Sequence, residues 1–328
     1  MYLVTGATGF VGSAVTRQLL ARGENVRVLS RAGSDQTNIR DLHVEVVEGD
    51  LLKPETLRSA VEGCDGVFHV AADYRLWTRN PETMFRTNVD GSRAIVRAAL
   101  SAGVGRIVYT SSVAVLGNVP GGVADEDTPV TYADMIGPYK QSKFRADEAV
   151  RQLIEEKGAP VVIVNPSTPI GPRDVKPTPT GRVIVEAASG KMPAYVDTGL
   201  NVAHVDDVAA GHLLALDKGS IGESYILGGD DMPLADILAV VARHTSSRPP
   251  FVKLPHSAIM PIAHLAEMWT SITGGDEPFV TVDGVRMARK KMFFSSAKAE
   301  RELGYSHRSA DQALGDAVTW FNDNGYLR

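Results

Sequence analysis

A tyrosine and a lysine four positions apart, Tyr139 and Lys143, are the residues of this chain best suited to proton transfer. Residues four apart share one helix face, so both side chains would point the same way from the helix predicted over residues 138–157. A nearby ammonium stabilises a phenolate and lowers the tyrosine pKa, which lets the phenol exchange a proton with a substrate oxygen. The spacing alone is common on structural helices. Its weight comes from Ser111 and Ser112, which end the preceding predicted strand.

A glycine-rich turn near the start of the sequence predicts a phosphate-binding site. Gly6, Gly9 and Gly12 follow the apolar run 1–4 and precede a helical pattern over residues 13–22. Glycines let the backbone approach a ligand, and the first turn of a helix offers unpaired N–H donors. The spacing is one residue longer than the simplest dinucleotide fingerprint, so alone it also fits an ordinary strand-to-helix turn.

Strand-like and helical patterns alternate along the first half of the chain. Runs rich in Val and Ile recur between helical segments, with Gly or Pro at most joins. This alternation predicts an α/β fold of the Rossmann type, a doubly wound parallel sheet covered on both faces. After the first strand, the expected strands are 26–30, 44–47, 66–70, 106–110 and 161–164, and the further expected helices are 54–61, 82–102 and 138–157.

The residues after the second strand bear on the choice between NAD and NADP. Ligands of a doubly wound sheet collect beyond the carboxyl ends of its strands, and NAD-selective folds place an acid about twenty residues past the glycines. Here the strand ends in Ser30 and Arg31, and the first acid is Asp35. A cation at this place accommodates a 2′-phosphate, so NADP is favoured. NAD remains the alternative if Arg31 is merely a solvated loop residue.

Together, the glycine turn, the serine pair and the Tyr139/Lys143 pair resemble the extended short-chain dehydrogenase/reductase family, part of the NAD-dependent epimerase/dehydratase superfamily. The resemblance runs over nearly the whole chain, to a closing segment at residues 295–305. More narrowly, the chain resembles the branch that holds hopanoid-associated sugar epimerases and dihydroflavonol-4-reductase-like enzymes. The segments that carry this narrower likeness are 71–77, 165–182, 191–207 and 285–296.

The resemblance implies a role for each member of the catalytic set. Tyr139 would be the general acid or base, Lys143 would bind the nicotinamide ribose and tune Tyr139, and Ser112 would hold the reacting oxygen. Ser112 is preferred to Ser111 because the family's catalytic serine is the last of its serine run. The expected cofactor contacts are Gly6, Thr8, Gly9, Phe10, Val11, Arg31, Asp50, Leu51, Ala71, Ala72, Asn88, Thr110, Tyr139, Lys143, Pro166, Ser167 and Thr168.

By the same resemblance, the chain would hold two interlocked domains. Residues 1–165 would form the NAD(P)-binding domain, with segments near 200–230 returning to it, and residues 166–328 would mostly form a smaller mixed α/β substrate domain. Several apolar side chains could line a pocket for a small or ring-shaped substrate, although each is more typical of packing than of recognition. They are Tyr74, Trp77, Met84, Pro169, Ile170, Pro193 and Tyr195.

Two enzyme functions stay open at this point. The favoured one is an NADP-dependent reductase or dehydrogenase that transfers hydride to or from a carbonyl or alcohol carbon. The alternative is a nucleotide-sugar epimerase or dehydratase with tightly bound NAD, which the branch resemblance would link to hopanoid biosynthesis. A nucleotide sensor without chemistry would have no need for Ser112, Tyr139 and Lys143.

Composition limits the partners and the compartment. Lys plus Arg total 34 against 39 Asp plus Glu, a net charge of −5, which disfavours nucleic acid. The basic run 286–291 is therefore better explained as a solvated or partner-facing segment. The lone Cys64 cannot form an intramolecular disulfide, which suggests a reducing compartment.

Targeting and metal signals are weak. With a strand at its first residues and no apolar run of membrane-spanning length, the chain is expected to be cytoplasmic, without a transmembrane segment. His204 has no companion at metal-ligand spacing, so no metal is expected. A homodimer through the helices near 82–102 and 138–157 is implied by the family alone.

Overall fold

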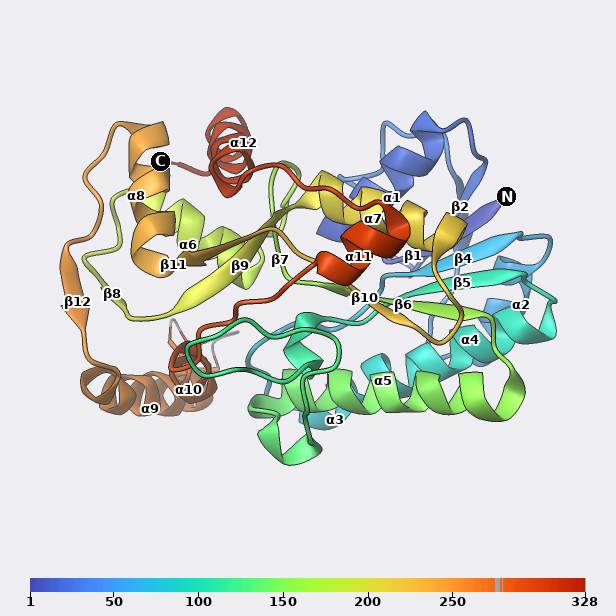
Figure 1. The fold of residues 1–328 in the computed structure, drawn as a ribbon, viewed down its shortest axis with the longest axis horizontal. Coiled ribbons are helices and arrows are strands. Elements are labelled where there is room, and N and C mark those ends of the chain that lie inside the picture. Colours follow the sequence, from blue (N-terminus) through green and yellow to red (C-terminus); the bar gives the residue numbers. More distant parts are fainter. Residues whose placement is uncertain (275–277, 279, 328) are drawn as a thin grey trace.

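The computed structural model describes residues 1–274, 278 and 280–327. Its main sheet has seven parallel strands in the order β10-β6-β5-β4-β1-β2-β3 (Figure 1). The order reverses beside β1, so the first strand lies inside the sheet and its carboxyl end opens on the crevice where doubly wound folds bind ligands. The strands are β1 (Tyr2–Thr5), β2 (Val26–Ser30), β3 (Glu45–Glu48), β4 (Gly66–His69), β5 (Arg106–Thr110), β6 (Val161–Pro166) and β10 (Ser224–Leu227).

Helices cover both faces of this sheet. Figure 1 shows α1, α7 and α11 above it and α2, α4 and α5 below it. The upper helices are α1 (Phe10–Ala21), α7 (Val205–Lys218) and α11 (Ala297–Leu303). The lower ones are α2 (Leu57–Val61, after the short helix η1 at Pro54–Thr56), α3 (Pro81–Phe85), α4 (Gly91–Ser101) and α5 (Gly137–Lys157).

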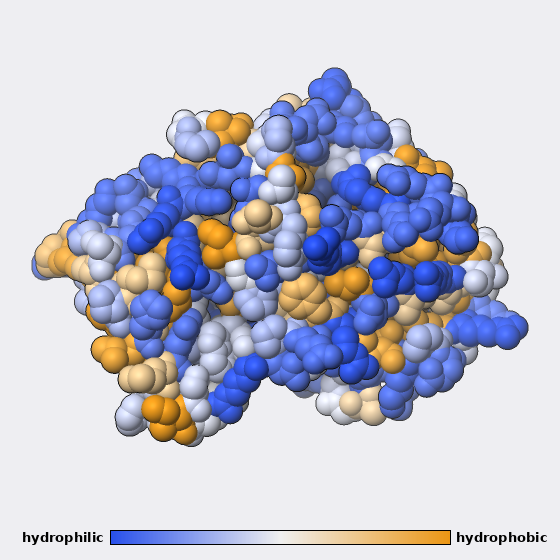
Figure 2. Space-filling view, turned by 90° about the horizontal axis from the view of Figure 1, so that it is seen from below, coloured by the Kyte–Doolittle hydropathy of each residue, from blue (hydrophilic) through white to orange (hydrophobic). Residues whose placement is uncertain are grey.

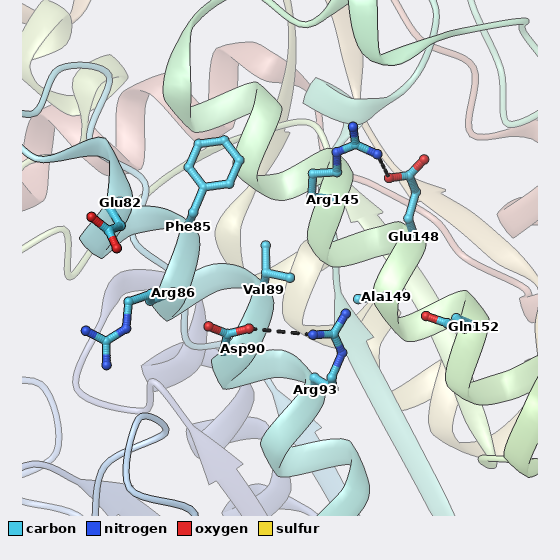
Figure 3. Close-up of a pocket in the computed structure, with 10 residues that line it drawn as sticks. All are labelled: Glu82, Phe85, Arg86, Val89, Asp90, Arg93, Arg145, Glu148, Ala149 and Gln152. Atoms are coloured by element: carbon cyan, nitrogen blue, oxygen red, sulfur yellow. Dashed lines mark hydrogen bonds and ion pairs between the residues drawn. The ribbon is translucent and has the colours of Figure 1, made fainter.

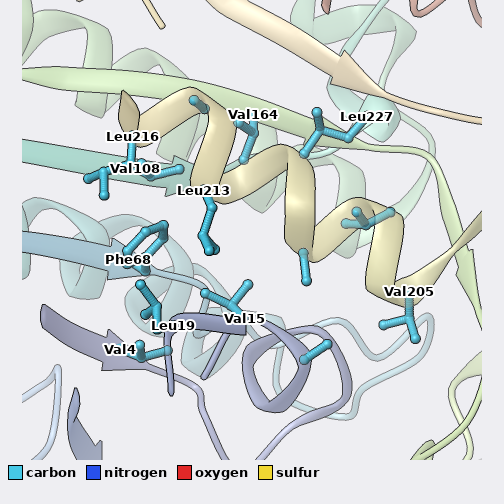
Figure 4. Packing of buried hydrophobic residues seen from close by; sticks show 14 of the residues in the cluster. Val4, Val15, Leu19, Phe68, Val108, Val164, Val205, Leu213, Leu216 and Leu227 are labelled. Carbon is cyan, nitrogen blue, oxygen red and sulfur yellow. The ribbon is translucent and has the colours of Figure 1, made fainter. Parts of the chain in front are cut away.

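Strand residues alternate between the two layers of core. Val4, Phe68, Val108 and Val164 point to the side of α1 and α7 (Figure 4), where they pack with Leu19. Their neighbours belong to the opposite cluster, with the buried faces of α2, α4 and α5; these are Leu3, Val67, Ile107 and Ile163. Strands buried on both sides explain why the sequence shows continuous apolar runs here rather than alternation.

The rest of the chain forms a smaller lobe, at the left of Figure 1. Two small sheets, β11-β9-β7 and β12-β8, lie there. The strands are β7 (Thr168–Ile170), β8 (Ala194–Val196), β9 (Gly199–His204), β11 (Asp230–Pro233) and β12 (Val252–Leu254). The helices are α6 (Pro179–Ala188), α8 (Leu234–Thr245), α9 (His256–Thr273), α10 (Val282–Ala288) and α12 (Ala310–Asp323).

The predicted fold class is confirmed, with shifts at several boundaries. Helix α1 begins three residues before the predicted start, because the glycine turn leads directly into it. The helix predicted over residues 82–102 is interrupted by a π-helical turn, η2 (Arg86–Asp90). Such turns often mark functional sites, and this one carries the buried Asn88.

The glycine turn is tightly closed. The Gly9 amide donates to the Gly6 carbonyl oxygen at 2.9 Å. Gly6 has φ +73°, a left-handed conformation that favours glycine, and a Cβ there would lie 2.7 Å from the Ala71 amide nitrogen. A Cβ on Gly12 would lie 2.1 Å from the Gly6 oxygen. Gly6 and Gly12 are therefore required by close backbone packing alone, whereas a Cβ on Gly9 would lie 3.2 Å from the Gly6 oxygen.

This closeness predicts the effect of Gly12→Ala. The methyl group meets backbone atoms that cannot move without opening the turn, so we expect a loss of roughly 1–3 kcal/mol in the free energy of unfolding. Urea unfolding followed by circular dichroism measures it. Gly105→Ala is the matched control, because its Cβ would meet nothing nearer than 3.7 Å. Equal stabilities for the two variants would contradict the packing argument.

Candidate active site

The end of β5 and the first turn of α5 bring the three expected catalytic residues together. The Ser112 hydroxyl lies near the Tyr139 phenol and favours its ionised form. The Lys143 ammonium donates to the backbone carbonyl of Thr110, the last residue of β5, at 2.8 Å. Ser112 begins the short helix η3 (Val113–Val115), and its Oγ accepts the Ala114 amide at 3.0 Å. Side chains from two neighbouring elements thus converge on one point beyond the sheet edge.

Burial shifts the pKa values of both Tyr139 and Lys143. It raises the pKa of Tyr139 above its ordinary value, and the nearby Ser112 hydroxyl offsets only part of that rise. It also lowers the pKa of Lys143 to about 8, against the opposing effect of the Asp147 carboxylate. The expectation that Lys143 lowers the Tyr139 pKa is therefore not met, since desolvation dominates. A protonated phenol at neutral pH is the form that donates a proton.

Asn88 fixes the segment after β4 against the start of α5. Its amide group exchanges two hydrogen bonds with the backbone of Asp73, at 2.7 and 2.9 Å. It also donates to the Ser142 Oγ at 2.9 Å, and that hydroxyl in turn donates to the Tyr139 carbonyl. Asn88 was predicted as a cofactor contact, but every hydrogen bond that the structure gives its side chain is internal. Its evident role is to position residues 71–75 next to Tyr139.

The glycine turn fits a dinucleotide. Gly9 is the N-cap of α1 and offers no capping side chain, so the first amides of the helix are left for an anionic ligand. The Thr8 carbonyl is held by the buried Asn38, which ties the loop after β2 to the turn. A Cβ at Gly6 or Gly12 would meet the backbone of Ala71 or of Gly6 itself, so both glycines are needed to keep the turn closed in this shape. These features are what binding of a pyrophosphate requires.

Arg31 lies exposed directly after β2, and its guanidinium makes no hydrogen bond or ion pair in the part of the chain described, while its backbone carbonyl accepts the Ser34 amide at 3.1 Å. Asp35, the first acid after this strand, is turned away: its Oδ1 accepts the amide and hydroxyl of Thr37 at 2.9 and 2.6 Å. A cation, rather than a carboxylate, is therefore free at the carboxyl end of β2.

Some predicted contacts face elsewhere. Phe10 and Leu51 are 8% exposed and belong to the two sheet cores, so only their backbone groups face a ligand. The Asp50 Oδ1 accepts the Leu52 amide. The Thr110 hydroxyl is bonded to His212 Nε2 at 3.0 Å, and only its carbonyl serves Lys143.

The remaining predicted contacts lie on the same edge of the sheet. That edge carries the residues that follow each strand, because all seven strands are parallel. Gly6, Gly9, Thr8 and Val11 follow β1, Ala71 and Ala72 follow β4, and Pro166, Ser167 and Thr168 end β6 or follow it.

Four buried polar atoms near the ends of β5 and β6 have no hydrogen-bond partner among the described residues. They are Tyr109 Oη, Ser111 Oγ, Asn165 Oδ1 and Ser167 Oγ. Buried polar atoms are normally paired, so these atoms mark where a polar ligand is expected. The Asn165 Nδ2 holds the Ser112 carbonyl at 3.0 Å. Asn165 was missed as a site residue, and its place directly before Pro166 at a strand end was the available signal.

Lys140 is a second residue that the motif did not single out. Its ammonium is half-buried beside Tyr139 and makes no hydrogen bond or ion pair that the described residues supply. Burial, and then the nearby Lys290, lowers its pKa to about 8. Its position next to Tyr139 in the sequence was the only signal for it.

A surface pocket lies away from these groups, in a groove between η2–α4 and α5 (Figure 3). Asp90 pairs with Arg93, and Arg145 pairs with Glu148, on its two walls. None of the predicted site residues lines it. No cluster of His, Cys, Asp or Glu suited to a metal ion is present in the described ranges.

Comparisons with known proteins agree with this geometry. The chain is 44% identical to a Synechocystis protein provisionally named dihydroflavonol 4-reductase, over 100% of this chain and 96% of that one. It is 34% identical to sterol demethylase protein B of Methylococcus capsulatus, over 99% of both chains. The solved structure of gox2253 superposes with a TM-score of 0.90 at 53% identity and covers 100% of this chain and 99% of its own.

The family model described as "NAD dependent epimerase/dehydratase family" matches residues 2–228, from β1 through β10. This range includes the glycine turn, the serine pair, Tyr139 and Lys143. The chain therefore belongs to the NAD-dependent epimerase/dehydratase family and is an oxidoreductase of the NAD(P)-dependent kind.

Proposed function

We propose that this enzyme is an NADP-dependent reductase that interconverts a carbonyl and an alcohol through Ser112, Tyr139 and Lys143. The observation that carries the proposal is the Tyr139 phenol beside Ser112 at the sheet edge, on the same helix as the buried Lys143, with a pKa that burial raises further above neutral. A neutral phenol donates a proton to a carbonyl oxygen as that oxygen becomes a hydroxyl. The coenzyme, when bound, supplies the hydride.

Each of the three side chains has a distinct task in this proposal. Tyr139 gives its hydroxyl proton to the substrate oxygen. Ser112 donates a hydrogen bond to the same oxygen and fixes its position beside the phenol. Lys143, held by the Thr110 carbonyl, places a positive charge where the phenolate forms. The free Arg31 after β2 supports NADP, because a guanidinium binds a 2′-phosphate through charge-assisted hydrogen bonds.

The substrate class follows from relatives and from exposed side chains. Among relatives at 30% identity or more, one is named sterol demethylase protein B and another a farnesyl-dihydroquinoline-oxide ketoreductase. Both names point to large apolar ring compounds. Tyr74 is 42% exposed in the segment that Asn88 positions. Met84 and Ile170, by contrast, are fully buried and pack in the protein interior.

A second function is favoured by the family description itself, which names epimerases and dehydratases. Such an enzyme keeps NAD bound and returns the hydride to the same substrate. The nucleotide released from freshly purified protein by denaturation separates the two. Near-stoichiometric NAD with no preference for NADPH on re-titration would support the epimerase or dehydratase, whereas an empty protein that selects NADPH supports the reductase.

Tyr139→Phe tests the proton donor. It removes the hydroxyl alone, so we expect kcat for NADPH-dependent reduction of a ring ketone or aldehyde to fall by about 10²–10⁴, with the Kd for NADPH unchanged. Stopped-flow loss of NADPH absorbance gives kcat, and fluorescence titration gives Kd. Tyr132→Phe, in the short helix η4 (Tyr132–Asp134), is the matched control. Full activity in the Tyr139 variant would refute the assignment.

Arg31→Ala tests the coenzyme preference. Removal of the guanidinium should weaken NADPH binding by about tenfold or more while it leaves NADH binding within a factor of about two. Titration of both coenzymes into wild type and variant measures the two constants. Arg40→Ala, exposed in the same loop and bonded to Thr37, should change neither. An equal loss for NADPH and NADH would exclude a role for Arg31 in phosphate binding.

Lys143→Met tests the cost of the buried charge. Burial lowers the Lys143 pKa from 10.5 to about 8, so the folded state disfavours the ammonium below that pH. The inactive Met variant should therefore be more stable than wild type at neutral pH. This difference should shrink as pH rises from about 8 to 10.5, where the unfolded chain also loses the proton. Urea midpoints across this range measure it, with the exposed Lys53→Met as control; a constant difference would contradict it.

A further inference from the structure

Exposed apolar side chains gather on one helix of the smaller lobe. Of the large apolar side chains that are exposed in the described residues, five lie on α9. Trp269 is 69% exposed and Ile272 is 75% exposed. The five residues recur at spacings of three and four, which places all of them along one side of the helix. The five, which we call the outer face of α9, are Ile262, Leu265, Met268, Trp269 and Ile272.

The opposite side of α9 is already packed. Ala263 and Ala266 are buried, and Ala263 forms a small core with Val282 and Val285 of α10. An amphipathic surface helix needs only one apolar face, and a helix that is apolar on both sides is normally buried on both. The outer face thus exposes apolar surface that the fold of a single chain does not need.

The segment that holds this apolar face is rich in cations. The residues from 248 to 292 hold six Lys or Arg against four Asp or Glu, in a chain whose net charge is −5. Two of those acids are engaged: Glu267 accepts the Val282 amide at 2.7 Å, and Asp283 pairs with Arg286. Arg289 is exposed and has no acidic partner in the described residues, whereas the exposed Lys291 ammonium lies 3.9 Å from Asp197. Figure 2 shows hydrophobic and strongly hydrophilic surface side by side at the left, where α9 and α10 lie in Figure 1.

We propose that the outer face of α9 and the basic residues Arg286, Arg289 and Lys291 form a surface that docks on an anionic lipid bilayer. The combination of aliphatic side chains, an exposed tryptophan and flanking cations is what binds the boundary between acyl chains and negatively charged headgroups. No helix in the described ranges could cross a membrane. The docking is therefore peripheral, with α9 lying in the plane of the interface.

The proposed surface is built on elements that contact the segments on either side of Tyr139 in the fold. The Arg79 guanidinium, in the segment after β4, donates to the Thr270 carbonyl of α9 at 3.0 Å. At the other end of the site, a Cβ on Gly137, the first residue of α5, would lie 2.8 Å from Asp283 of α10. Docking would thus bring a lipid-dissolved substrate to the side of the molecule where Tyr139 lies. The docking itself does not depend on the proposed reaction, because it is measured without turnover.

Vesicle binding of the full chain tests the proposal. Co-sedimentation with phosphatidylcholine vesicles, with and without phosphatidylglycerol, gives the partition coefficient, and we expect binding that needs the anionic lipid and weakens in salt. The triple variant Leu265→Gln/Trp269→Gln/Ile272→Gln should bind about tenfold more weakly or worse. Neutralisation of Arg286, Arg289 and Lys291 by glutamine should weaken binding by roughly fivefold for each charge.

The controls separate docking from folding and from other occupants. Val46→Gln/Val123→Gln/Ile221→Gln alters exposed apolar residues elsewhere and should bind like wild type. Both test variants change exposed side chains, so their thermal unfolding should match wild type. The proposal fails if wild type binds neither vesicle, or if the control loses binding as much as the α9 variant. It also fails if light scattering shows a wild-type dimer that the α9 variant converts to monomer, because a second copy would then cover the face.

Discussion

Burial of the Lys143 ammonium is the constraint on which the arrangement of this site depends. Lys143 is only 3% exposed, so its charge must be balanced by the protein. The structure supplies the Thr110 carbonyl at 2.8 Å, the Tyr109 ring with its centroid 5.1 Å away, and the Asp147 carboxylate on the next turn of α5. The Thr110 carbonyl is available because β5 ends there. The Lys143 ammonium thus holds the end of β5 against the start of α5.

A chain of buried hydrogen bonds extends this lock across the sheet, and its donors can be assigned. Ser92 donates its hydroxyl proton to the Asn88 carbonyl at 2.6 Å, so His69 Nε2 must donate to Ser92 Oγ. His69 Nδ1 then accepts from Thr5 at 2.8 Å, which fixes a neutral ring. Burial, and then Lys143, lowers the His69 pKa to about 3, so the ring stays neutral at physiological pH. The Asn88 side-chain amide then donates to Ser142 Oγ in α5.

Much of this could be predicted from the sequence, and the rest could not for definable reasons. Short-range patterns predicted the strands, the long α5 and the glycine turn, because these depend on residues close in the chain. The π-helical turn at Asn88 was missed. The Asn88 side chain donates to Asp73 and Ser142, and no local sequence pattern connects these three residues. The direction of the Tyr139 pKa shift was wrong, because spacing reveals a nearby charge but not desolvation.

For Arg31 and the outer face of α9, the sequence shows the residues but not their surroundings in the fold. Both are visible as residue types, yet their meaning depends on what the fold leaves beside them. For Arg31, the fold adds that Asp35, the first acid after β2, is engaged by the Thr37 amide. The apolar residues of α9 would read as core in any sequence pattern, since their period is helical. Only the packing of α10 against the other side of α9 shows that these side chains remain uncovered and are available for a partner outside the chain.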